Sequence, residues 1–490
     1  MSDKVNKISI LVITSLASFL TPFMSSATNV SLPVIGKEFS MNAILLGWVA
    51  TSYLLATAVF LVPFGKISDI FGRKKIFLYG VTIYTISSIL VAIANTSFLL
   101  ILFRVFQGVG SAMIFGTSIA ILTSVFPIGE RGKVLGINVA VTYLGLSTGP
   151  FLGGLLTQYL TWRSIFLLNG LLGLVAIILT LTMMKTEWIY PAPMLKDSLD
   201  NSAGINSTAI PSKHWGGARG KREKIDFLGS GIYGIGLLLL IYGFTILPKT
   251  LGIGLVIISL IAIFIFILWE LKVANPILNI RLFQSNTGFG FSNLAASINY
   301  SATAAVGFLL SLYLQNVKGL SPSRAGVILI AQPIMMAIFS PFAGRLSDKI
   351  EARITASIGM AITFIALLLL IPLRTNTAII YIVIDLLILG LGFAIFSSPN
   401  MNAIMSSVDR QYYGVASGTL ATMRMVGQMF SMGIAMLIIS TIMGRVQIAP
   451  SNYGLFLKST KIAFTVFSIL CFGGIFASLA RGKLRQASTS

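Results

Sequence analysis

The sequence predicts an all-α polytopic membrane protein with fourteen spans. We expect two six-helix bundles related by a pseudo-two-fold axis, with two extra membrane helices between them. Of its 490 residues, 56% are hydrophobic and only 10% are charged, whereas soluble domains carry roughly 25% charged residues. The apolar runs are continuous over ~20 residues, where strands of a membrane barrel would alternate over ~10. Short motifs also recur at matching places in the two halves of the chain.

Fourteen apolar runs follow one another along the chain. The first six spans are expected at 8–35, 45–65, 75–95, 98–126, 133–158 and 163–185. An insert of two spans follows at 226–247 and 251–271. The last six spans are expected at 287–315, 324–346, 353–373, 377–401, 411–443 and 460–480. Most of these lengths are near the ~20 residues that cross a bilayer as a helix.

These runs divide the chain into five parts. We expect an N-terminal six-helix bundle (1–185), a linker (186–225), the two-helix insert (226–272), a C-terminal six-helix bundle (273–483) and a cytoplasmic tail (484–490). The linker is rich in Pro, Ser, Gly and Lys and has no apolar period. It is therefore predicted to be a disordered cytoplasmic segment.

The basic residues predict the orientation in the membrane. The chain has 35 Lys and Arg against 14 Asp and Glu, for a net charge of +21. Placing the loop between spans 2 and 3 inside puts 24 basic residues in inside loops and nine in outside loops, with Arg104 and Arg424 within spans. This bias is the positive-inside pattern, so both termini are expected in the cytoplasm and the protein in the plasma membrane. The same placement argues against a nucleic-acid partner.

Cysteine and histidine are nearly absent, which bears on enzyme chemistry. Cys471 is the single cysteine and lies in an apolar run, and His214 is the single histidine and lies in a polar loop. No metal site or cofactor is therefore expected. A membrane enzyme would need a nucleophile–base pair or metal ligands at membrane depth. We expect a protein that is not an enzyme; a membrane receptor or enzyme is the alternative of another class.

A charged loop after span 2 recurs after span 10. Both copies follow a proline and have the pattern Gly-x-x-Ser-Asp, at 65–69 and at 344–348. A receptor would not need such a repeat. The second copy lacks the Gly-Arg-Lys-Lys sequence that extends the first over 72–75, so the two loops are not equivalent. The candidate gating residues are Gly65, Asp69, Gly72, Arg73, Gly344 and Asp348.

Polar and adaptable side chains follow single faces of several spans. In span 1, six residues lie on one helix face: Ser15, Ser18, Pro22, Ser25, Ser26 and Asn29. Lipid cannot satisfy such a stripe, so it faces either a cavity or another helix. Met and aromatic side chains in spans 9 and 10 suit amphipathic organic substrates, although they could also pack helices. The substrate-cavity candidates are Ser25, Ser26, Asn29, Gln107, Ser111, Asn293, Tyr300, Gln332, Met336, Phe339 and Gln428.

Three ionisable residues lie within spans. Arg104 is near the start of span 4, Arg424 is deeper in span 13, and Asp385 is the one carboxylate well inside a span. A charge at membrane depth costs ~2.5 kcal/mol or more unless it is paired or hydrated. We therefore consider Arg104, Asp385 and Arg424 as candidates for proton coupling. The alternatives are a snorkelling arginine at 104 and a structural ion pair at 385.

Span 5 carries closely spaced glycines around a proline. The set comprises Gly145, Gly149, Pro150, Gly153 and Gly154. Glycines four residues apart allow close helix approach, and proline removes a backbone donor and bends the helix. We expect this segment to be a joint between the two halves.

Four motifs in order resemble the major facilitator superfamily, in particular its fourteen-span drug:proton antiporters. The loop 65–75 resembles the signature loop between spans 2 and 3, and Arg104, Gln107, Gly108 and Gly110 resemble the span-4 motif. The span-5 glycines resemble a motif associated with exporters. Asp226-Phe227-x-Gly229 and Trp162-Arg163-x-x-Phe166 are similar to features of the fourteen-span branch.

The resemblance implies a role for each motif. Asp69 would cap and latch a helix of the other half, Arg104 would couple proton binding to the cavity, and the span-5 glycines would form the flexing joint. One position departs from the pattern. Met24 stands where these exporters often have an acid in span 1, ahead of Asn29-Val30-Ser31-Leu32-Pro33. The usual carboxylate for protons or cationic drugs is missing there, and Asp385 is the candidate substitute.

We therefore expect a proton-coupled exporter of small amphipathic, drug-like organic compounds that works by alternating access. The energy source would be the proton gradient, with no cofactor. The expected partners are the small-molecule substrate and the lipid bilayer, with no obligatory protein partner evident. A uniporter or importer of a specific metabolite, without proton coupling, remains the alternative within transporters.

Overall fold

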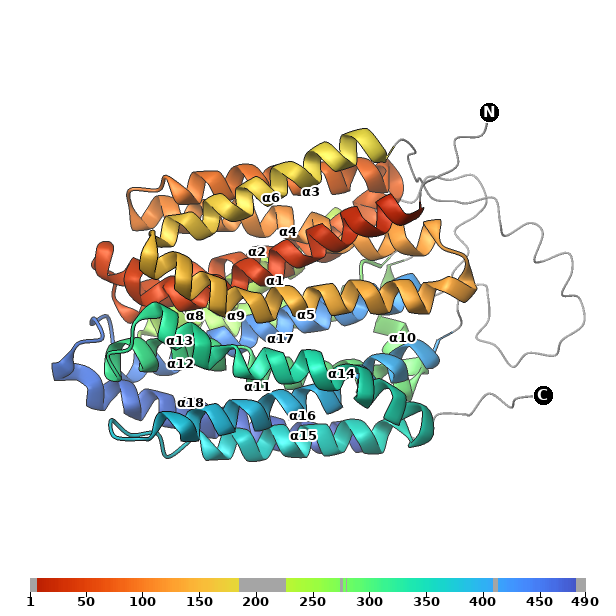
Figure 1. The fold of residues 1–490 in the computed structure, drawn as a ribbon. Coiled ribbons are helices and arrows are strands. Elements are labelled where there is room, and N and C mark those ends of the chain that lie inside the picture. Colours follow the sequence, from red (N-terminus) through yellow and green to blue (C-terminus); the bar gives the residue numbers. More distant parts are fainter. Residues whose placement is uncertain (1–6, 185–225, 274–275, 279, 409–412, 482–490) are drawn as a thin grey trace, which may run out of the picture.

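The computed structural model describes residues 7–184, 226–273, 276–278, 280–408 and 413–481. Over these residues the chain folds into long helices that run side by side in one bundle (Figure 1). Fourteen of its spans are long and apolar enough to cross a membrane, which confirms the predicted number. The predicted linker 186–225 and tail 484–490 lie outside the described residues.

The N-terminal half consists of six helices. They are α1 (Lys7–Glu38), α2 (Ala43–Phe71), α3 (Arg73–Ala92), α4 (Ser97–Val125), α5 (Ile128–Tyr159) and α6 (Trp162–Met183). Within this half α1 packs on α5, α2 on α4, and α3 on both α4 and α6. Polar caps begin some of these helices, because the first backbone N–H groups of a helix have no partner within it. Asn42 accepts from Leu45 N at 2.9 Å at the start of α2, and Thr96 does the same for α4.

Two helices form the insert, and the C-terminal half follows it. The insert is α8 (Phe227–Ile246) and α9 (Thr250–Lys272), which pack on each other. A short helix, α10 (Ile280–Ser285), leads into the C-terminal half. The elements of that half are α11 (Thr287–Thr303), α12 (Val306–Leu312), η2 (Tyr313–Val317), α13 (Pro322–Leu329), α14 (Ala331–Lys349), α15 (Ala352–Leu369), α16 (Ile379–Ser406), α17 (Tyr413–Ile442), η4 (Pro450–Asn452) and α18 (Tyr453–Leu479).

The ninth and tenth spans differ from the continuous helices that were expected. The ninth breaks between α11 and α12, where the hydroxyl of Ser431 accepts the freed backbone N–H of Ala305 at 2.9 Å. The tenth breaks at Ile330, between α13 and α14. Pro333 follows directly, and its ring and missing N–H disfavour an unbroken helix one turn before it. Hydrophobic periodicity does not register such breaks, because both segments remain apolar.

The insert packs across both halves rather than against one. Its helix α8 contacts α2 of the N-terminal half and α17 of the C-terminal half. Leu55 of α2, Leu237 of α8 and Met425 of α17 belong to one apolar cluster. The hydroxyl of Tyr233 also donates to the carbonyl of Ala58 at 3.2 Å. The insert therefore bridges the line along which the two halves meet.

The two ends of the bundle differ in how the halves join. We call the end where α1 begins and α18 ends the terminal end, on the right in Figure 1. At the opposite end Ser311 and Gln315 donate to α1 carbonyls at 2.6 and 2.7 Å. Ala43 N donates to Val446 O at 3.2 Å at that same end. Among pairs of described residues, we find no hydrogen bond that joins the halves at the terminal end. The structure is therefore closed at the opposite end.

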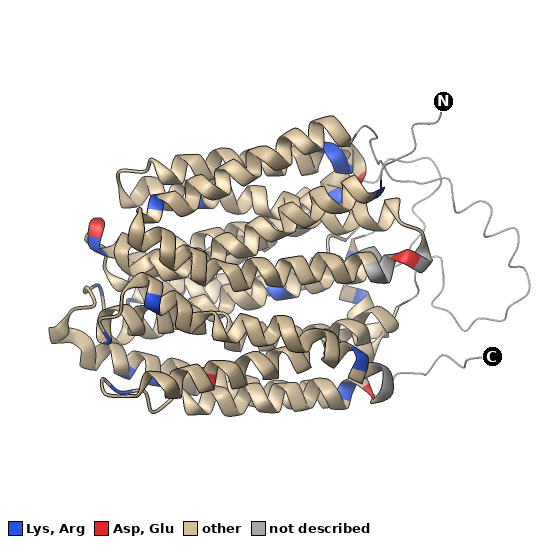
Figure 2. Ribbon diagram, in the orientation of Figure 1, with Lys and Arg blue, Asp and Glu red and all other residues tan. Residues whose placement is uncertain are grey.

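Charged residues are distributed unevenly along the length of the helices. They gather near the two ends of the helices and are sparse along the middle (Figure 2). This distribution fits helices whose central segments cross an apolar layer, because lipid does not solvate charge. The few charges at mid-depth are therefore the ones to examine for function.

Candidate functional site

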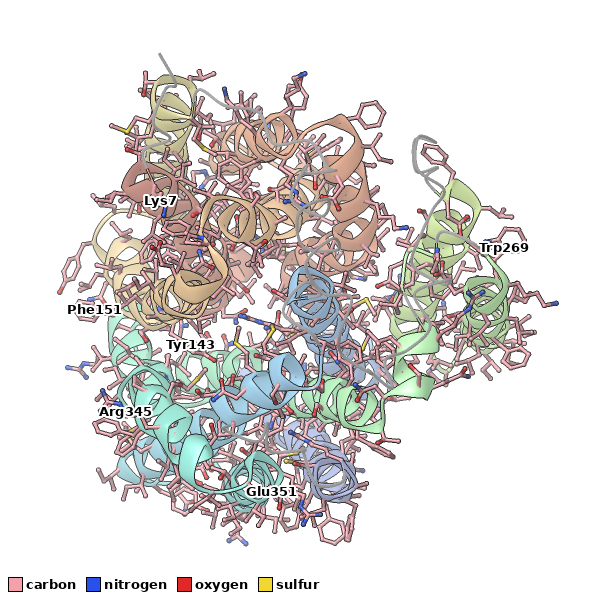
Figure 3. All side chains as sticks on the ribbon, turned by 90° about the vertical axis from the view of Figure 1, so that its right-hand side faces the viewer. Lys7, Tyr143, Phe151, Trp269, Arg345 and Glu351 are labelled. Atoms are coloured by element: carbon pink, nitrogen blue, oxygen red, sulfur yellow. The ribbon has the colours of Figure 1, made fainter. Side chains whose placement is uncertain are left out.

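Four side chains from four helices form an apolar cluster where the halves meet. Tyr143 of α5 joins Tyr300 of α11, Met336 of α14 and Phe393 of α16, and we call these four the central cluster. Tyr300 and Phe393 lie edge to face, with ring centroids 5.4 Å apart. The Tyr143 and Ser397 hydroxyls lie 2.8 Å apart and form a hydrogen bond between the halves. Viewed from the terminal end, Tyr143 lies between the two groups of helices (Figure 3).

Arg424 of α17 lies beside this cluster. Its guanidinium carbon is 5.4 Å from the centroid of the Tyr300 ring. One turn farther along α17, Gly427 packs against the backbone of α11, where a Cβ would lie 2.6 Å from Ser297 O. This close approach places Arg424 over Tyr300, because the two helices are held together one turn away. The Nε of Arg424 is buried and makes no hydrogen bond.

Arg104 lies inside the N-terminal half instead. Its side chain is 1% exposed. It donates from Nε to Val49 O at 3.0 Å and from Nη1 to Gln107 Oε1 at 2.5 Å. Its guanidinium also lies 4.4 Å from the Tyr53 ring centroid. Gln107 completes the chain by donating to Ser88 of α3 at 2.7 Å. Arg104 and Gln107 therefore tie α2, α3 and α4 together.

Asp385 is isolated within the C-terminal half. It lies a quarter of the way along α16 and is 1% exposed. Neither of its carboxylate oxygens has a hydrogen-bond partner, and none of the four ion pairs between described residues includes it. The structure does not place it beside Arg424 or Arg104. Asp385 therefore remains a candidate proton-binding residue, at a site separate from the central cluster.

The span-5 glycines divide between two contacts. Gly145, Gly149 and Gly153 pack against α1 of the same half, where a Cβ on Gly145 would lie 2.5 Å from Phe19 O. Gly154 instead packs across the halves, where a Cβ would lie 2.5 Å from Pro322 O. From the other side, Gly326 of α13 approaches the carbonyl of Pro150. The contact between halves is thus made by the end of the motif, at the closed end.

Two residues of the gating loop, Asp69 and Arg73, contact their own half. The carboxylate of Asp69 accepts from Arg73 at 2.8 Å, and Arg73 also donates to Ala120 O of α4 at 2.9 Å. Gly72, between α2 and α3, has φ +109°, a conformation that favours glycine. A contact of Asp69 with the other half stays a prediction. In the second copy, a Cβ on Gly344 would lie 2.9 Å from the Ser398 hydroxyl, and Asp348 lies within α14.

The remaining cavity candidates lie in different surroundings. Ser26 donates to Pro22 O at 2.9 Å, and Asn293 donates to Phe289 O at 3.0 Å, each within its own helix. Ser111 is hydrogen-bonded to Tyr53 at 2.8 Å inside the N-terminal half. The half-buried candidates are Ser25, Asn29, Gln332 and Gln428, and Phe339 is the exposed one.

Sequence reasoning missed three residues at this site. Tyr143, Phe393 and Ser397 were not singled out, although each meets a predicted residue or its helix. For Tyr143 a signal was present, because it lies two residues before the first glycine of the span-5 motif. For Phe393 and Ser397 the sequence offers no signal, since both lie in a run of apolar and small residues.

Comparisons with known proteins agree with this architecture. The sequence model described as Major Facilitator Superfamily matches residues 14–432 and 292–488. The riboflavin transporter RibZ of Clostridioides difficile (strain 630) is 29% identical over 87% of this chain and 86% of its own length. The multidrug resistance protein Stp of Mycobacterium tuberculosis (strain CDC 1551 / Oshkosh) is 28% identical over 87% of this chain and 74% of its own length.

A solved structure supports the fold independently of close sequence similarity. The chain resembles a bacterial homologue of the human lysosomal transporter Spinster with a TM-score of 0.65 at 15% identity. The match covers 99% of this chain and 98% of that one. Such a likeness at low identity indicates a shared fold.

Proposed function

The chain belongs to the major facilitator superfamily, and from this premise we propose that it exports small amphipathic organic compounds across the plasma membrane by proton-coupled alternating access. Members of this family are transporters rather than enzymes. One observation carries the proposal. Hydrogen bonds between described residues join the two halves at the closed end, and the central cluster lies between the halves.

The chemistry of the central cluster suits amphipathic organic substrates. Tyr143, Tyr300 and Phe393 offer ring faces, and Met336 is a flexible, polarisable side chain that adapts to different shapes. Hydroxyls of Tyr143 and Ser397 add hydrogen-bonding groups at the same place. Apolar walls with a few polar groups are the usual composition of small-molecule sites.

Export of drug-like compounds is supported by named relatives and by the span-5 motif. Stp is named a multidrug resistance protein. The motif that resembles exporters packs α5 against α1 and, at Gly154, against the other half. Proton coupling is proposed to act through Asp385, with Arg104 and Arg424 as the intramembrane cations. Both termini would face the cytoplasm, so that the terminal end is the cytoplasmic end.

A second candidate function is transport of one specific metabolite without proton coupling. RibZ is named a riboflavin transporter, which favours this reading. Met24, where the exporters often have an acid, also favours it, since the chain lacks that carboxylate.

Transport into inside-out vesicles separates the two functions. Vesicles containing the protein are given an imposed pH gradient and a panel of ethidium, rhodamine 123, fluorescein and riboflavin. We expect at least one compound to accumulate only while the gradient persists, and a protonophore to abolish the accumulation. If a compound equilibrates across the membrane but never responds to the gradient, the protein is a uniporter and proton-coupled export is wrong.

A further inference from the structure

We propose that the central cluster and Arg424 bind planar aromatic organic anions, with the anionic group on Arg424 and the ring system against Tyr300 and Phe393. This inference rests on the proposed transport function and names the substrate class of that same site. It begins from the charge at mid-depth between the halves.

Arg424 carries a positive charge that is not paired with an acid among the residues that the structure describes. It is eleven residues into α17, which corresponds to about 16 Å from the helix start at 1.5 Å per residue. None of the four ion pairs between described residues includes it, and its buried Nε has no hydrogen-bond partner. An isolated cation at this depth is costly, and the face of the Tyr300 ring offsets part of that cost. An anion bound beside Arg424 would offset the remaining cost.

Tyrosines on neighbouring helices lie near Arg424. Tyr300 of α11 lies beneath its guanidinium. Tyr143 of α5 packs with Tyr300 in the central cluster. Phenol hydroxyls and a guanidinium all donate hydrogen bonds, so the site is rich in donors. Carboxylate and phenolate oxygens are the acceptors that such a set recognises, and Arg binds them through paired N–H groups.

The site selects against cations for the same reason. A lipophilic cation at the central cluster would lie near Arg424, and none of the four ion pairs between described residues brings a carboxylate there. Like charges brought together in a low-dielectric site repel strongly.

The aromatic part of the ligand follows from the cluster itself. Tyr300 and Phe393 lie edge to face, so the pair offers both a ring face and a ring edge at one place. Planar rings stack on such pairs with favourable offset geometries. Met336 and the Tyr143–Ser397 contact complete the site from α14 and across the halves.

Two dyes with the same ring system test the charge preference. Fluorescein is an anion and rhodamine 123 a cation at pH 8, and both contain the planar xanthene ring. Fluorescence anisotropy would measure their binding to the purified full-length protein in lipid nanodiscs. We expect the wild type to bind fluorescein at least about tenfold more tightly than rhodamine 123, the size of one charge-assisted hydrogen bond.

Variants at Arg424 locate the preference. Arg424→Gln should lose about tenfold or more in fluorescein affinity without weakening rhodamine 123, and Arg424→Lys should retain part of the fluorescein affinity. Arg324→Gln, an exposed arginine at the closed end, should change neither. If the wild type prefers rhodamine 123, or Arg424→Gln leaves fluorescein affinity within about twofold, the proposal is wrong. If Arg424→Gln does not fold, the wild-type preference and Arg424→Lys decide.

Binding and transport outcomes are distinguishable. Selective fluorescein binding without gradient-driven uptake would overturn the proposed export function and leave this inference standing. Gradient-driven uptake of cationic dyes with no fluorescein binding would overturn this inference and leave export standing.

Discussion

Asp385 and Gln107 are both buried polar side chains within spans, and they differ in what satisfies them. Gln107 accepts from Arg104 and donates to Ser88, so its amide is used at both ends. Asp385 has two buried oxygens without partners. A satisfied buried group holds a fold together, whereas an unsatisfied one is costly and persists where function needs it. Changing Asp385 should therefore affect transport, whereas changing Gln107 should affect stability.

Replacing Asp385 by Asn tests its role in proton coupling. Because Asn cannot bind and release a proton, gradient-driven uptake into inside-out vesicles should fall by about tenfold or more, while exchange of substrate without a gradient continues. Glu130→Gln is the matched control, since Glu130 is a half-exposed acid paired with Lys7 at the terminal end. Gradient-driven uptake at the wild-type rate in Asp385→Asn would exclude Asp385 as the proton site.

Gln107→Leu tests whether Gln107 contributes to packing or to substrate binding. The change removes the acceptor of Arg104 Nη1 and the donor to the Ser88 hydroxyl, which keeps its own bond to Tyr84 O. The free energy of unfolding should therefore fall by ~1–3 kcal/mol. Thermal unfolding in detergent should show a lower Tm, and the order of preference among the dyes should not change. Gln332→Leu is the comparison for the dye preference, because Gln332 is a half-buried cavity candidate in the other half. An altered dye preference with an unchanged Tm would place Gln107 in the binding site.

At the scale of elements, helix α5 uses one glycine motif to contact both α1 and α13. Its glycines at 145, 149 and 153 hold it to α1, whereas Gly154 meets α13 of the other half. The broken ninth and tenth spans meet the N-terminal half in the same region, through α12 and α13. A short stretch of α5 therefore contacts both α1 and the other half at the closed end.

Gly154→Val should weaken that closure. A Cβ at this position would lie 2.5 Å from Pro322 O, so α5 and α13 must separate. In a Cys471→Ser background, a cysteine introduced at Asn29 should react faster with a maleimide in the Gly154→Val protein than in its parent. Gly136→Val on the same helix is the control, because no atom lies within 4 Å of its added Cβ. Equal reaction rates in all three proteins would show that this contact does not hold the end closed.

The insert is the element whose place the sequence left most open. Asp226 caps α8 through Gly229 N at 2.8 Å and also accepts from Trp269 of α9 at 2.8 Å. The bond from Trp269 ties α9 to the start of α8 at the terminal end, while the apolar face of α8 covers α2 and α17. Any relative movement of α2 and α17 must therefore be accommodated along α8.

For the whole molecule, the proposed function requires opening of an end that the structure shows closed. Ala43 N donates to Val446 O at 3.2 Å across the halves. Backbone-paired residues at this spacing fall in the range of Cα distances that a disulfide can bridge.

A disulfide at this place should block transport. In the Cys471→Ser background, Ala43→Cys with Val446→Cys should cross-link on oxidation and stop uptake, and reductant should restore it. Ala43→Cys alone should be insensitive to oxidant. Full cross-linking with undiminished uptake would mean that transport does not require this end to open.

The fourteen spans, the fold class and the charges at membrane depth followed from the sequence alone, because the apolar length and the alternation of loops are local properties of the chain. Tyr300 and Met336 were also predicted, since helical periodicity identifies the polar or adaptable face of a span. Only the tertiary structure decided which faces meet. Tyr143 and Ser397 are 254 residues apart and touch across the halves, while Arg104 and Arg424, alike in sequence context, lie in separate surroundings. Periodicity gives the direction in which a side chain points from its own helix, and the neighbour it meets depends on packing between helices.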